Sequence, residues 1–399
     1  MQFSSAEDFH AHLKSLKQRF DAMPPVLEKT FTDPAMNVEG YVVVWNTDIC
    51  KNGPLFANQK GCGKGGTRIK QDLSLHDIKR LAKAMAEKNA AVGLPMGGAK
   101  SGINMSPDDP NYEAKFKRFV ELVKESGILY EHGGVFGGFG YDIGCKPPMN
   151  ALWAVDVLGS GRSFTGKPLE MGGTDYEKIG IAGYGVAVAG LHLIRSRKEQ
   201  ENLTFAVQGV GAMGGAVLKY FSQFGFQIKS LSDPRFGGTW VFDKQPSIAL
   251  INNPTPEMIA KEAQKVSDDP SGALYADVDI IFPCALEDSL TVDNADRVKA
   301  RYVVEGANNP TTDEAHQIFF DKNILVAPDI LSNAGGIIAA FVEMTESDDT
   351  ADKSAIALNL TRVRISANIK QMMDYIDTLN VRPDLVADAM TYMNIFKGE

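Results

Sequence analysis

Three lysines in the first quarter of the chain lie where a solvated lysine has no obvious use. Lys64 lies in segment 61–68, which is too rich in glycine for a regular element and can bring main chain close to a ligand, so we predict a binding loop there. Lys88 ends the apolar stripe of a predicted helix at 75–89. Lys100 follows a proline and two glycines in a segment that we interpret as a turn with small neighbours.

Basic residues outnumber acidic ones around these lysines, whereas the whole chain is acidic. Residues 51–100 hold ten Lys or Arg and three Asp or Glu, although the formal net charge of the chain is -9 at pH 7. A cationic pocket in an acidic protein suits a small anion. Plain structural explanations also exist. Lys88 could lay its methylenes along the core with its ammonium in water, and glycine-rich turns are common on surfaces.

An aspartate ends a second glycine-rich segment. Five glycines precede Asp142 within residues 133–144, which is an unlikely helix and a plausible wall of an active site. The alternative is a turn residue that caps its own backbone.

A dinucleotide-binding pattern lies in the second half of the chain. A predicted strand at 204–208 leads into a G-x-G-x-x-G turn and then a helix. The six residues of this turn are Gly209, Val210, Gly211, Ala212, Met213 and Gly214. The glycines allow a tight turn and close approach of the backbone to a pyrophosphate, which would rest on the helix N-terminus.

The acid that completes the pattern is Asp233, which ends a predicted strand at 227–232 and lies nineteen residues after the last glycine. A carboxylate there would accept hydrogen bonds from the adenosine ribose, which favours NAD. Arg235 could instead meet the 2′-phosphate of NADP, so the sequence leaves both coenzymes open.

The remaining pattern is that of an α/β protein. Apolar residues at helical spacing predict an N-terminal helix within residues 1–23, with Ser4 and Glu7 able to form a capping box. Short apolar runs predict strands at 41–45, 278–283, 302–305 and 324–327, and further helices are predicted at 112–126, 337–346 and 354–375.

The spacing of the three lysines, together with segment 94–102, resembles the glutamate/leucine/phenylalanine/valine dehydrogenases. The likeness runs from about Val42 to about Glu346. These enzymes convert amino acids reversibly to 2-oxo acids and ammonia with a nicotinamide coenzyme. The resemblance implies an α/β substrate domain with a mixed sheet, a Rossmann-type dinucleotide-binding domain, and an active site in the cleft between them. We place these domains at 1–170 and 171–340, with C-terminal helices at 341–399 returning to the substrate domain.

The resemblance also implies roles for the charged residues. Lys100 would polarise the oxygen on the reacting carbon and activate water, and Asp142 would move protons at nitrogen. Lys88 would hold the α-carboxylate and Lys64 the side-chain end of the substrate. Crowding of a lysine by other cations in a water-poor site lowers its pKa, which suits proton exchange near neutrality.

Two asparagines correspond to family segments that line the nicotinamide, namely Asn308 and Asn333. On local grounds they could equally cap turns or a helix.

The substrate is less well defined by the sequence. The resemblance implies that Lys64 favours a dicarboxylate, because relatives acting on leucine or phenylalanine place an apolar residue there, so glutamate is our first candidate. Tyr141 and Ala182 stand where the family pattern has glycine and threonine, and Ala340 stands where glutamate-specific relatives commonly have serine. We predict that Tyr141 and Ala340 line the substrate pocket. The three changes could re-shape the pocket for an apolar or aromatic amino acid, and segment 88–94 is closer to the leucine-type relatives.

Composition excludes several other classes. At 399 residues the chain can form two domains, and its net negative charge argues against a nucleic-acid partner. The four cysteines and six histidines show no disulfide or metal-ligand spacing. No signal peptide or membrane span is predicted, so we expect a cytoplasmic protein with no metal and no membrane partner. The resemblance implies a homo-oligomer.

Two rival functions remain at this point. The chain could be a two-domain dehydrogenase acting on a hydroxy acid or a folate-like substrate, which would work without ammonia. It could also be a non-catalytic sensor of nucleotide or amino acid, because Tyr141, Ala182 and Ala340 depart from the family pattern.

Overall fold

The computed structural model describes residues 3–49, 61–198, 202–346 and 352–397 and divides into two compact units. Unit 1 comprises Met1–His10, Tyr176–Gly336 and Leu358–Asp388, and unit 2 comprises Ala11–Asp175, Ile337–Ala357 and Ala389–Glu399. The sequence interpretation placed the whole of 341–399 with the substrate domain. The structure groups Leu358–Asp388 with unit 1, where Ile365 lies close to Gly185: a Cβ on that glycine would lie 2.8 Å from the Ile365 side chain.

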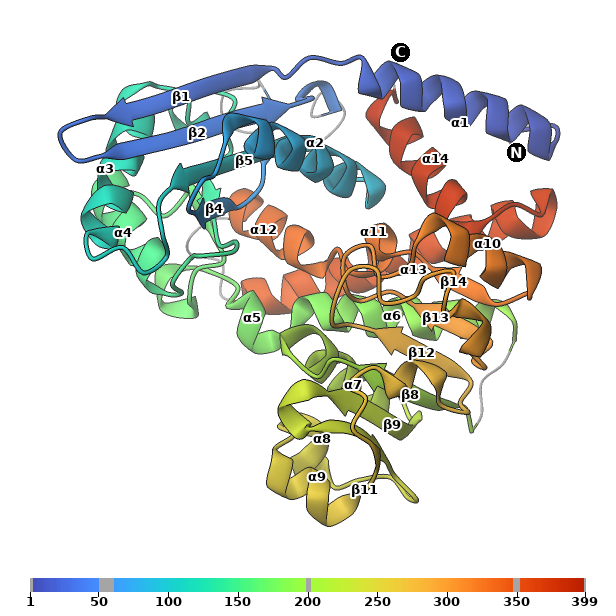
Figure 1. The fold of residues 1–399 in the computed structure, drawn as a ribbon. Helices are drawn as coiled ribbons and strands as arrows, with labels where there is room; N and C mark the ends of the chain where they lie inside the picture. Colours follow the sequence, from blue (N-terminus) through green and yellow to red (C-terminus); the bar gives the residue numbers. More distant parts are fainter. Residues whose placement is uncertain (1–2, 50–60, 199–201, 347–351, 398–399) are drawn as a thin grey trace. The chain divides into compact units, whose positions relative to one another are not determined.

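Unit 2 is built on a mixed five-stranded sheet. Its strands are β1 (Leu27–Asp33), β2 (Val38–Trp45), β3 (Gly63–Lys64), β4 (Thr67–Lys70) and β5 (Gly97–Asn104). β1, β2 and β5 are antiparallel neighbours, and both β3 and β4 pair with β5 in parallel. Figure 1 shows β1 and β2 as a long hairpin with β5 beside β2. The predicted mixed α/β sheet is confirmed.

The segment around Lys100 is a strand, so the predicted turn there is wrong. β5 is buried along almost its whole length, and its glycines let neighbouring elements approach. A Cβ on Gly98 would lie 2.1 Å from the Ala86 nitrogen, so only glycine lets α2 (Leu75–Ala91) pack this closely on the strand. Packing therefore overrides the low strand propensity of glycine. The loop predicted at 61–68 is wrong for the same reason, because this glycine-rich segment forms β3 and the start of β4.

The other described elements of unit 2 surround this sheet. They include α3 (Tyr112–Glu125), α4 (Met149–Leu158), the short parallel pair β6 (Phe139–Gly140) and β7 (Phe164–Thr165), and 3₁₀ turns at Tyr130–His132 and Leu169–Met171. α12 (Gly335–Thr345) lies mostly in unit 2, and α14 (Pro383–Ile395) contributes its end. The core is aromatic: the Phe119 ring is 5.9 Å from that of Phe31 and 6.1 Å from that of Phe139.

The N-terminal helix α1 (Ala6–Asp21) is capped by Ser5, one residue after the predicted cap Ser4. The main-chain nitrogen of Asp8 donates to the Ser5 hydroxyl at 3.2 Å, and the Asp8 carboxylate accepts from the main chain of Ser4 at 3.0 Å. Aspartate at the third position thus replaces the glutamate that we predicted, because the first turn starts at Ala6.

Unit 1 is a seven-stranded sheet of the Rossmann type. Its strands, in spatial order, are β11 (Gln264–Ser267), β10 (Gly238–Val241), β9 (Gln227–Asp233), β8 (Thr204–Gln208), β12 (Ile280–Pro283), β13 (Tyr302–Val304) and β14 (Leu325–Ala327). The five strands β9, β8, β12, β13 and β14 are parallel, and β10 pairs antiparallel with both β9 and β11. All five parallel strands were predicted within a few residues, so the Rossmann-type fold is confirmed.

Helices complete unit 1. They are α5 (Tyr176–Ile179), α6 (Ile181–Ser196), α7 (Ala212–Gln223), α8 (Ile248–Asn252), α9 (Pro256–Glu262), α10 (Asp313–Asp321), α11 (Asp329–Ser332) and most of α13 (Lys353–Leu379). 3₁₀ turns lie at Pro234–Phe236, Gly272–Tyr275 and Ala295–Arg297. Within the described residues, no helix is long and apolar enough to cross a membrane, and no cluster of three or more His, Cys, Asp or Glu could hold a metal ion.

Candidate active site

Asp142 is held between two cations in unit 2. Lys100 approaches its Oδ2 at 2.7 Å from the middle of β5. The Arg68 guanidinium of β4 donates from Nε to the same oxygen at 2.8 Å and from Nη2 to Oδ1 at 3.3 Å. The Lys100 side chain is 7% exposed and that of Asp142 18%, so this pair is largely shielded from water. The parallel pairing of β4 with β5 brings the two cations to one carboxylate.

The pKa values of this pair are shifted in ways that keep Asp142 ionised. Burial lowers the pKa of Lys100, and the nearby Asp142 carboxylate opposes this effect. Burial also acts to raise the pKa of Asp142, but the Lys100 charge and the Arg68 hydrogen bond outweigh it, so that pKa is lowered. A lysine with a lowered pKa beside an ionised carboxylate gives up and regains its proton more readily than a solvated lysine.

Lys64 lies at the end of β3, with its ammonium enclosed by main-chain carbonyls. The ammonium donates to the oxygens of Gly65 at 3.0 Å, Gly138 at 3.2 Å and Phe139 at 2.6 Å. These acceptors match the three donors of an ammonium, so a substrate carboxylate must share or displace one of them. Burial lowers the pKa of Lys64 to about 7, against the raising effect of Glu343.

Lys88 is half-buried in the last turn of α2. The next residue, Asn89, joins this helix end by hydrogen bonds to the strands that carry the other two lysines. Its side-chain nitrogen donates to the main-chain carbonyl of Lys64 at 3.2 Å and to that of Gly97 at 2.8 Å. The charge of Lys100 also acts on Lys64. All four predicted polar residues of the substrate site therefore belong to unit 2, and Lys100 and Asp142 are in direct contact.

The two predicted pocket residues lie in the same unit on different elements. Tyr141 is half-buried directly before Asp142, and its ring lies 5.1 Å from that of Phe164 in an edge-to-face arrangement. Ala340 is buried in α12. The third departure from the family pattern, Ala182, is half-buried in α6 of unit 1.

The glycine turn of unit 1 has the geometry of a pyrophosphate cradle. Gly209 has a φ of 79°, which favours glycine, and a Cβ on Gly214 would lie 1.8 Å from the Gly209 carbonyl oxygen. A Cβ on Gly211 would meet nothing within 4 Å, so the tip of the turn is open at the start of α7. Val210, Ala212 and Met213 complete the predicted turn between β8 and α7. This arrangement fits a dinucleotide phosphate on the helix N-terminus.

Asp233 is engaged by protein groups on both of its oxygens. Oδ2 accepts from the Val210 main chain at 2.7 Å and from Arg235 Nη2 at 3.0 Å, while Oδ1 accepts from the main chain and Nε of Arg235 at 2.8 and 2.9 Å. The Arg235 side chain is 59% exposed. Ribose hydroxyls would therefore reach Asp233 by displacing this arginine.

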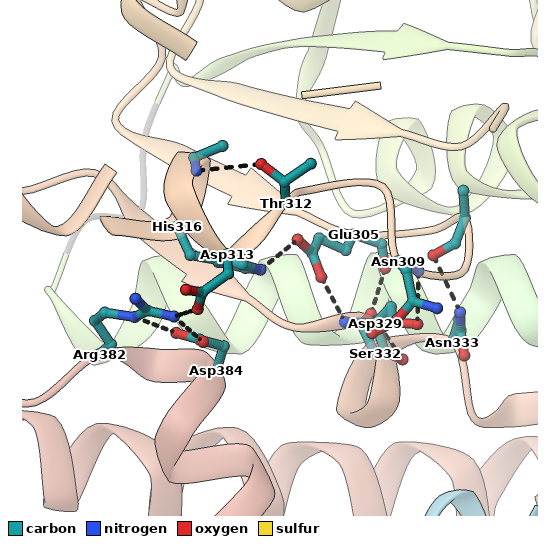
Figure 2. Close-up of polar contacts among 12 residues, drawn as sticks. Glu305, Asn309, Thr312, Asp313, His316, Asp329, Ser332, Asn333, Arg382 and Asp384 are labelled. Atoms are coloured by element: carbon teal, nitrogen blue, oxygen red, sulfur yellow. Dashed lines mark hydrogen bonds and ion pairs between the residues drawn. The ribbon is translucent and has the colours of Figure 1, made fainter. Parts of the chain in front are cut away.

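Asn308 and Asn333 of unit 1 are hydrogen-bonded to each other, and Figure 2 shows Asn333 with the polar residues around it. The Asn333 amide nitrogen donates to Asn308 Oδ1 at 3.1 Å and to the carbonyls of Gly306 and Ala307 at 3.2 and 3.4 Å. Asn333 is 7% exposed, and its Oδ1 has no hydrogen-bond partner within the described part of the chain. A buried acceptor of this kind fits the carboxamide N–H of a nicotinamide.

The sequence interpretation missed several charged residues near the predicted site. Arg68 lies in the predicted loop at 61–68 but was given no role. Lys167 and Glu343 form a buried ion pair at 3.1 Å, and both charges act on Lys64. The basic excess over residues 51–100 could have pointed to Arg68. The meeting of Lys167 with Glu343 depends on tertiary contact, which one sequence does not reveal.

A mixed-sheet unit with a shielded lysine–aspartate pair and a Rossmann-type unit with a G-x-G-x-x-G turn are features of a two-domain, dinucleotide-dependent oxidoreductase. Family comparison specifies it further. Residues 172–394 match the model for glutamate/leucine/phenylalanine/valine dehydrogenase, and residues 54–132 match that for the Glu/Leu/Phe/Val dehydrogenase dimerisation domain. The chain belongs to this family of NAD(P)-dependent amino acid dehydrogenases.

Individual relatives agree with this assignment. The chain is 34% identical to a glutamate dehydrogenase of Aeropyrum pernix, over 70% of this chain and 68% of that protein. It is 32% identical to a glutamate dehydrogenase of Thermotoga maritima, over 83% of this chain and 80% of that protein. It is also 32% identical to an NADP(+)-dependent glutamate dehydrogenase of Pyrobaculum calidifontis, over 86% of this chain and 80% of that protein. Among solved structures, glutamate dehydrogenase from Peptoniphilus asaccharolyticus has the same fold, with a TM-score of 0.75 and 21% identity over 98% and 97% of the two chains.

Proposed function

We propose that the protein catalyses the reversible, NAD(P)-dependent oxidative deamination of an L-amino acid to its 2-oxo acid and ammonia, with glutamate as the first candidate. The observation that carries this proposal is the shielded contact of Lys100 with Asp142 at 2.7 Å. Names of relatives support glutamate, since the Aeropyrum and Thermotoga proteins are glutamate dehydrogenases.

The residues of unit 2 supply the groups that the reaction needs. Lys88 holds the α-carboxylate and Lys64 the side-chain end of the substrate. Asp142, kept ionised by its two cations, accepts a proton from the substrate nitrogen. Lys100 then stabilises negative charge on the oxygen that forms at Cα and passes a proton to and from water.

The residues of unit 1 hold the coenzyme. The turn at 209–214 binds the pyrophosphate, and Asp233 binds the adenosine ribose. Asn308 and Asn333 bind the nicotinamide. Held there, the coenzyme would supply the acceptor for the hydride that leaves Cα, and the part of the protein is to orient it.

A panel of amino acids, assayed separately with NAD and NADP, tests the proposal. We expect turnover with at least one amino acid and an absolute requirement for ammonia in the reductive direction. Reduction of an oxo acid without ammonia would instead support a hydroxy acid or similar dehydrogenase. Failure to form NAD(P)H with every amino acid would favour a sensor. A preference for leucine or phenylalanine over glutamate would indicate that Tyr141 and Ala340 re-shape the pocket.

The pH dependence of substrate binding tests Lys64. Its pKa of about 7 means that its ammonium is charged below pH 7 and neutral above it. Because a dicarboxylate needs the charged form, we expect the KM for glutamate to rise about tenfold per pH unit above pH 7. An apolar amino acid should lack this additional slope, since it places no carboxylate at Lys64. Initial rates with the two substrates between pH 6 and about 9 give the comparison, and parallel slopes would contradict the role of Lys64.

The variant Arg235→Ala tests the choice of coenzyme. Removal of the arginine side chain opens the Asp233 oxygens to ribose hydroxyls and deletes the cation that can bind a 2′-phosphate. We expect the KM for NADP to rise about tenfold, roughly 1.4 kcal/mol, and that for NAD to change by less than about threefold. Arg297→Ala, an exposed arginine of unit 1 that lies over Tyr275, is the control. Equal changes with both coenzymes would remove Arg235 from coenzyme selection.

We also propose a homo-oligomer in the cytoplasm. The match of residues 54–132 to a dimerisation domain supports self-association. The cysteines Cys145 and Cys284 are free thiols, as a reducing compartment requires, and Cys50 lies outside the described residues.

A further inference from the structure

Glu305 is a buried acidic residue to which the reaction gives no role. It follows β13, is 1% exposed, and directly precedes the loop that carries Asn308. Burial and the Asp329 charge raise the pKa of Glu305 well above its ordinary value. Such a costly group is retained where it makes specific hydrogen bonds.

Glu305 holds both ends of the short helix α11. Its side-chain Oε2 accepts from the main-chain nitrogen of Asp329, the first residue of α11, at 2.9 Å. Its main-chain carbonyl accepts from the hydroxyl of Ser332, the last residue of that helix. Figure 2 shows the two contacts on either side of Glu305. One residue at the end of β13 therefore sets the position of α11, and Asn333 follows α11 directly.

The same contacts tie together the loops that carry the two asparagines. Asp329 Oδ2 accepts from the main chain of Asn309 at 3.1 Å, and Asn333 donates to Asn308 at 3.1 Å. Together with the bonds of Glu305 they join the two loops into one hydrogen-bonded frame (Figure 2). Within this frame the Asn333 amide nitrogen is committed to protein acceptors, and its buried Oδ1 remains as an acceptor.

Titratable groups of α10 and of segment 382–384 lie near the Glu305 carboxyl group. His316 of α10 places Nε2 3.4 Å from Oε1. Arg382 binds Asp313 and also Asp384, the latter at 2.6 Å from Nη2. His316 therefore lies on the Oε1 side of the carboxyl group, and Oε2 faces α11 through its bond with Asp329.

We infer that Glu305 is a positioning residue for the nicotinamide end of the coenzyme, because its carboxyl group and main-chain carbonyl fix α11 and thereby present the Asn333 acceptor beside Asn308. The inference rests on the proposed function, in which these asparagines hold the nicotinamide. It requires an oxygen acceptor at this position and not a negative charge.

Glutamine and alanine at position 305 separate these requirements. Glu305→Gln keeps an oxygen that accepts from Asp329, whereas Glu305→Ala removes it. We expect the dissociation constants of NADH and NADPH, measured by fluorescence titration without amino acid, to rise at least about tenfold for Glu305→Ala and less than about threefold for Glu305→Gln. In steady-state assays the KM for coenzyme should rise for Glu305→Ala, while the KM for the amino acid stays unchanged.

Asp279→Ala is the matched control in the same unit. Asp279 precedes β12 at the opposite, amino end of the parallel sheet, where its carboxylate accepts from the main chain of Thr204 at 2.8 Å. Its loss removes a comparable hydrogen bond far from the coenzyme end of the strands. Coenzyme binding within about threefold of wild type is expected for Asp279→Ala. Equal weakening in Glu305→Ala and Asp279→Ala would show general loss of stability and overturn the inference.

A second pair of variants applies if Glu305→Ala does not fold. Asp329→Pro removes the donor to Glu305 at the first position of α11, where proline is tolerated, and Pro328 before it is already extended with ψ of 147°. Asp329→Ala removes the same side chain but keeps the donor. Coenzyme binding at least about fivefold weaker in Asp329→Pro than in Asp329→Ala supports the inference, and equal binding overturns it. Wild-type protein that binds neither NADH nor NADPH overturns the proposed function itself, and the inference with it.

Discussion

Replacing Lys100 by alanine is expected to lower kcat by about three orders of magnitude, with the dissociation constant of NADH changed by less than about threefold. The ammonium is the only group of the contact pair with Asp142 that can stabilise negative charge on the reacting oxygen, and acid–base groups of this kind contribute about 10²- to 10⁴-fold. The fold should survive, because Asp142 keeps Arg68 at 2.8 Å as its partner. Single-turnover rates and fluorescence titration of NADH measure the two quantities.

Lys115→Ala is the control for loss of a buried lysine. Lys115 of α3 lies in the same unit, is buried, and approaches Asp109 at 2.7 Å, the distance that separates Lys100 from Asp142. We expect it to change thermal stability and leave kcat nearly unaltered. Activity of Lys100→Ala within about tenfold of wild type, roughly 1.4 kcal/mol of barrier, would remove Lys100 from the mechanism.

The sequence predicted the two folds because each has a strong local pattern. Alternating strands and helices with a glycine turn identify the Rossmann-type unit, since apolar runs buried on both faces differ plainly from amphipathic helices. The spacing of Lys64, Lys88 and Lys100 predicted the family. The match of the family model to residues 172–394 confirms that prediction.

Local pattern failed where glycine serves packing and not flexibility. Lys100 was predicted in a turn because two glycines precede it, yet Gly98 is needed for the contact of β5 with Ala86. A single sequence does not tell a glycine that permits a turn from one that admits a neighbouring helix.

Ion pairs between residues far apart in the sequence could not be predicted from local patterns, for a different reason. Arg68 and Asp142 lie 74 positions apart, and Lys167 and Glu343 lie 176 apart. Their pairing depends on strand register and on the return of α12 to unit 2. Glu305 was likewise predicted only as the end of a strand, because its contacts with α11 come from the next strand crossover.

Asp142→Asn is the second variant for which we expect a large effect, a fall in kcat of about 10³-fold. The substitution keeps the volume of the side chain but removes the carboxylate that, in the proposed mechanism, accepts the substrate proton. Asp109→Asn, which leaves Lys115 without its carboxylate, is the matched control and should retain near wild-type kcat. A kcat for Asp142→Asn within about tenfold of wild type would show that another group moves the proton.

The pH profile of Asp142→Asn separates proton transfer from general damage to the site. Burial lowers the pKa of Lys100, and the Asp142 charge and hydrogen bond oppose that effect. Without the carboxylate the pKa of Lys100 should fall further, so the ammonium is lost at a lower pH. Because the charged form stabilises the developing oxyanion, the alkaline limb of kcat in the residual activity should move to lower pH, whereas damage to the fold alone would lower kcat at every pH and leave the limb in place.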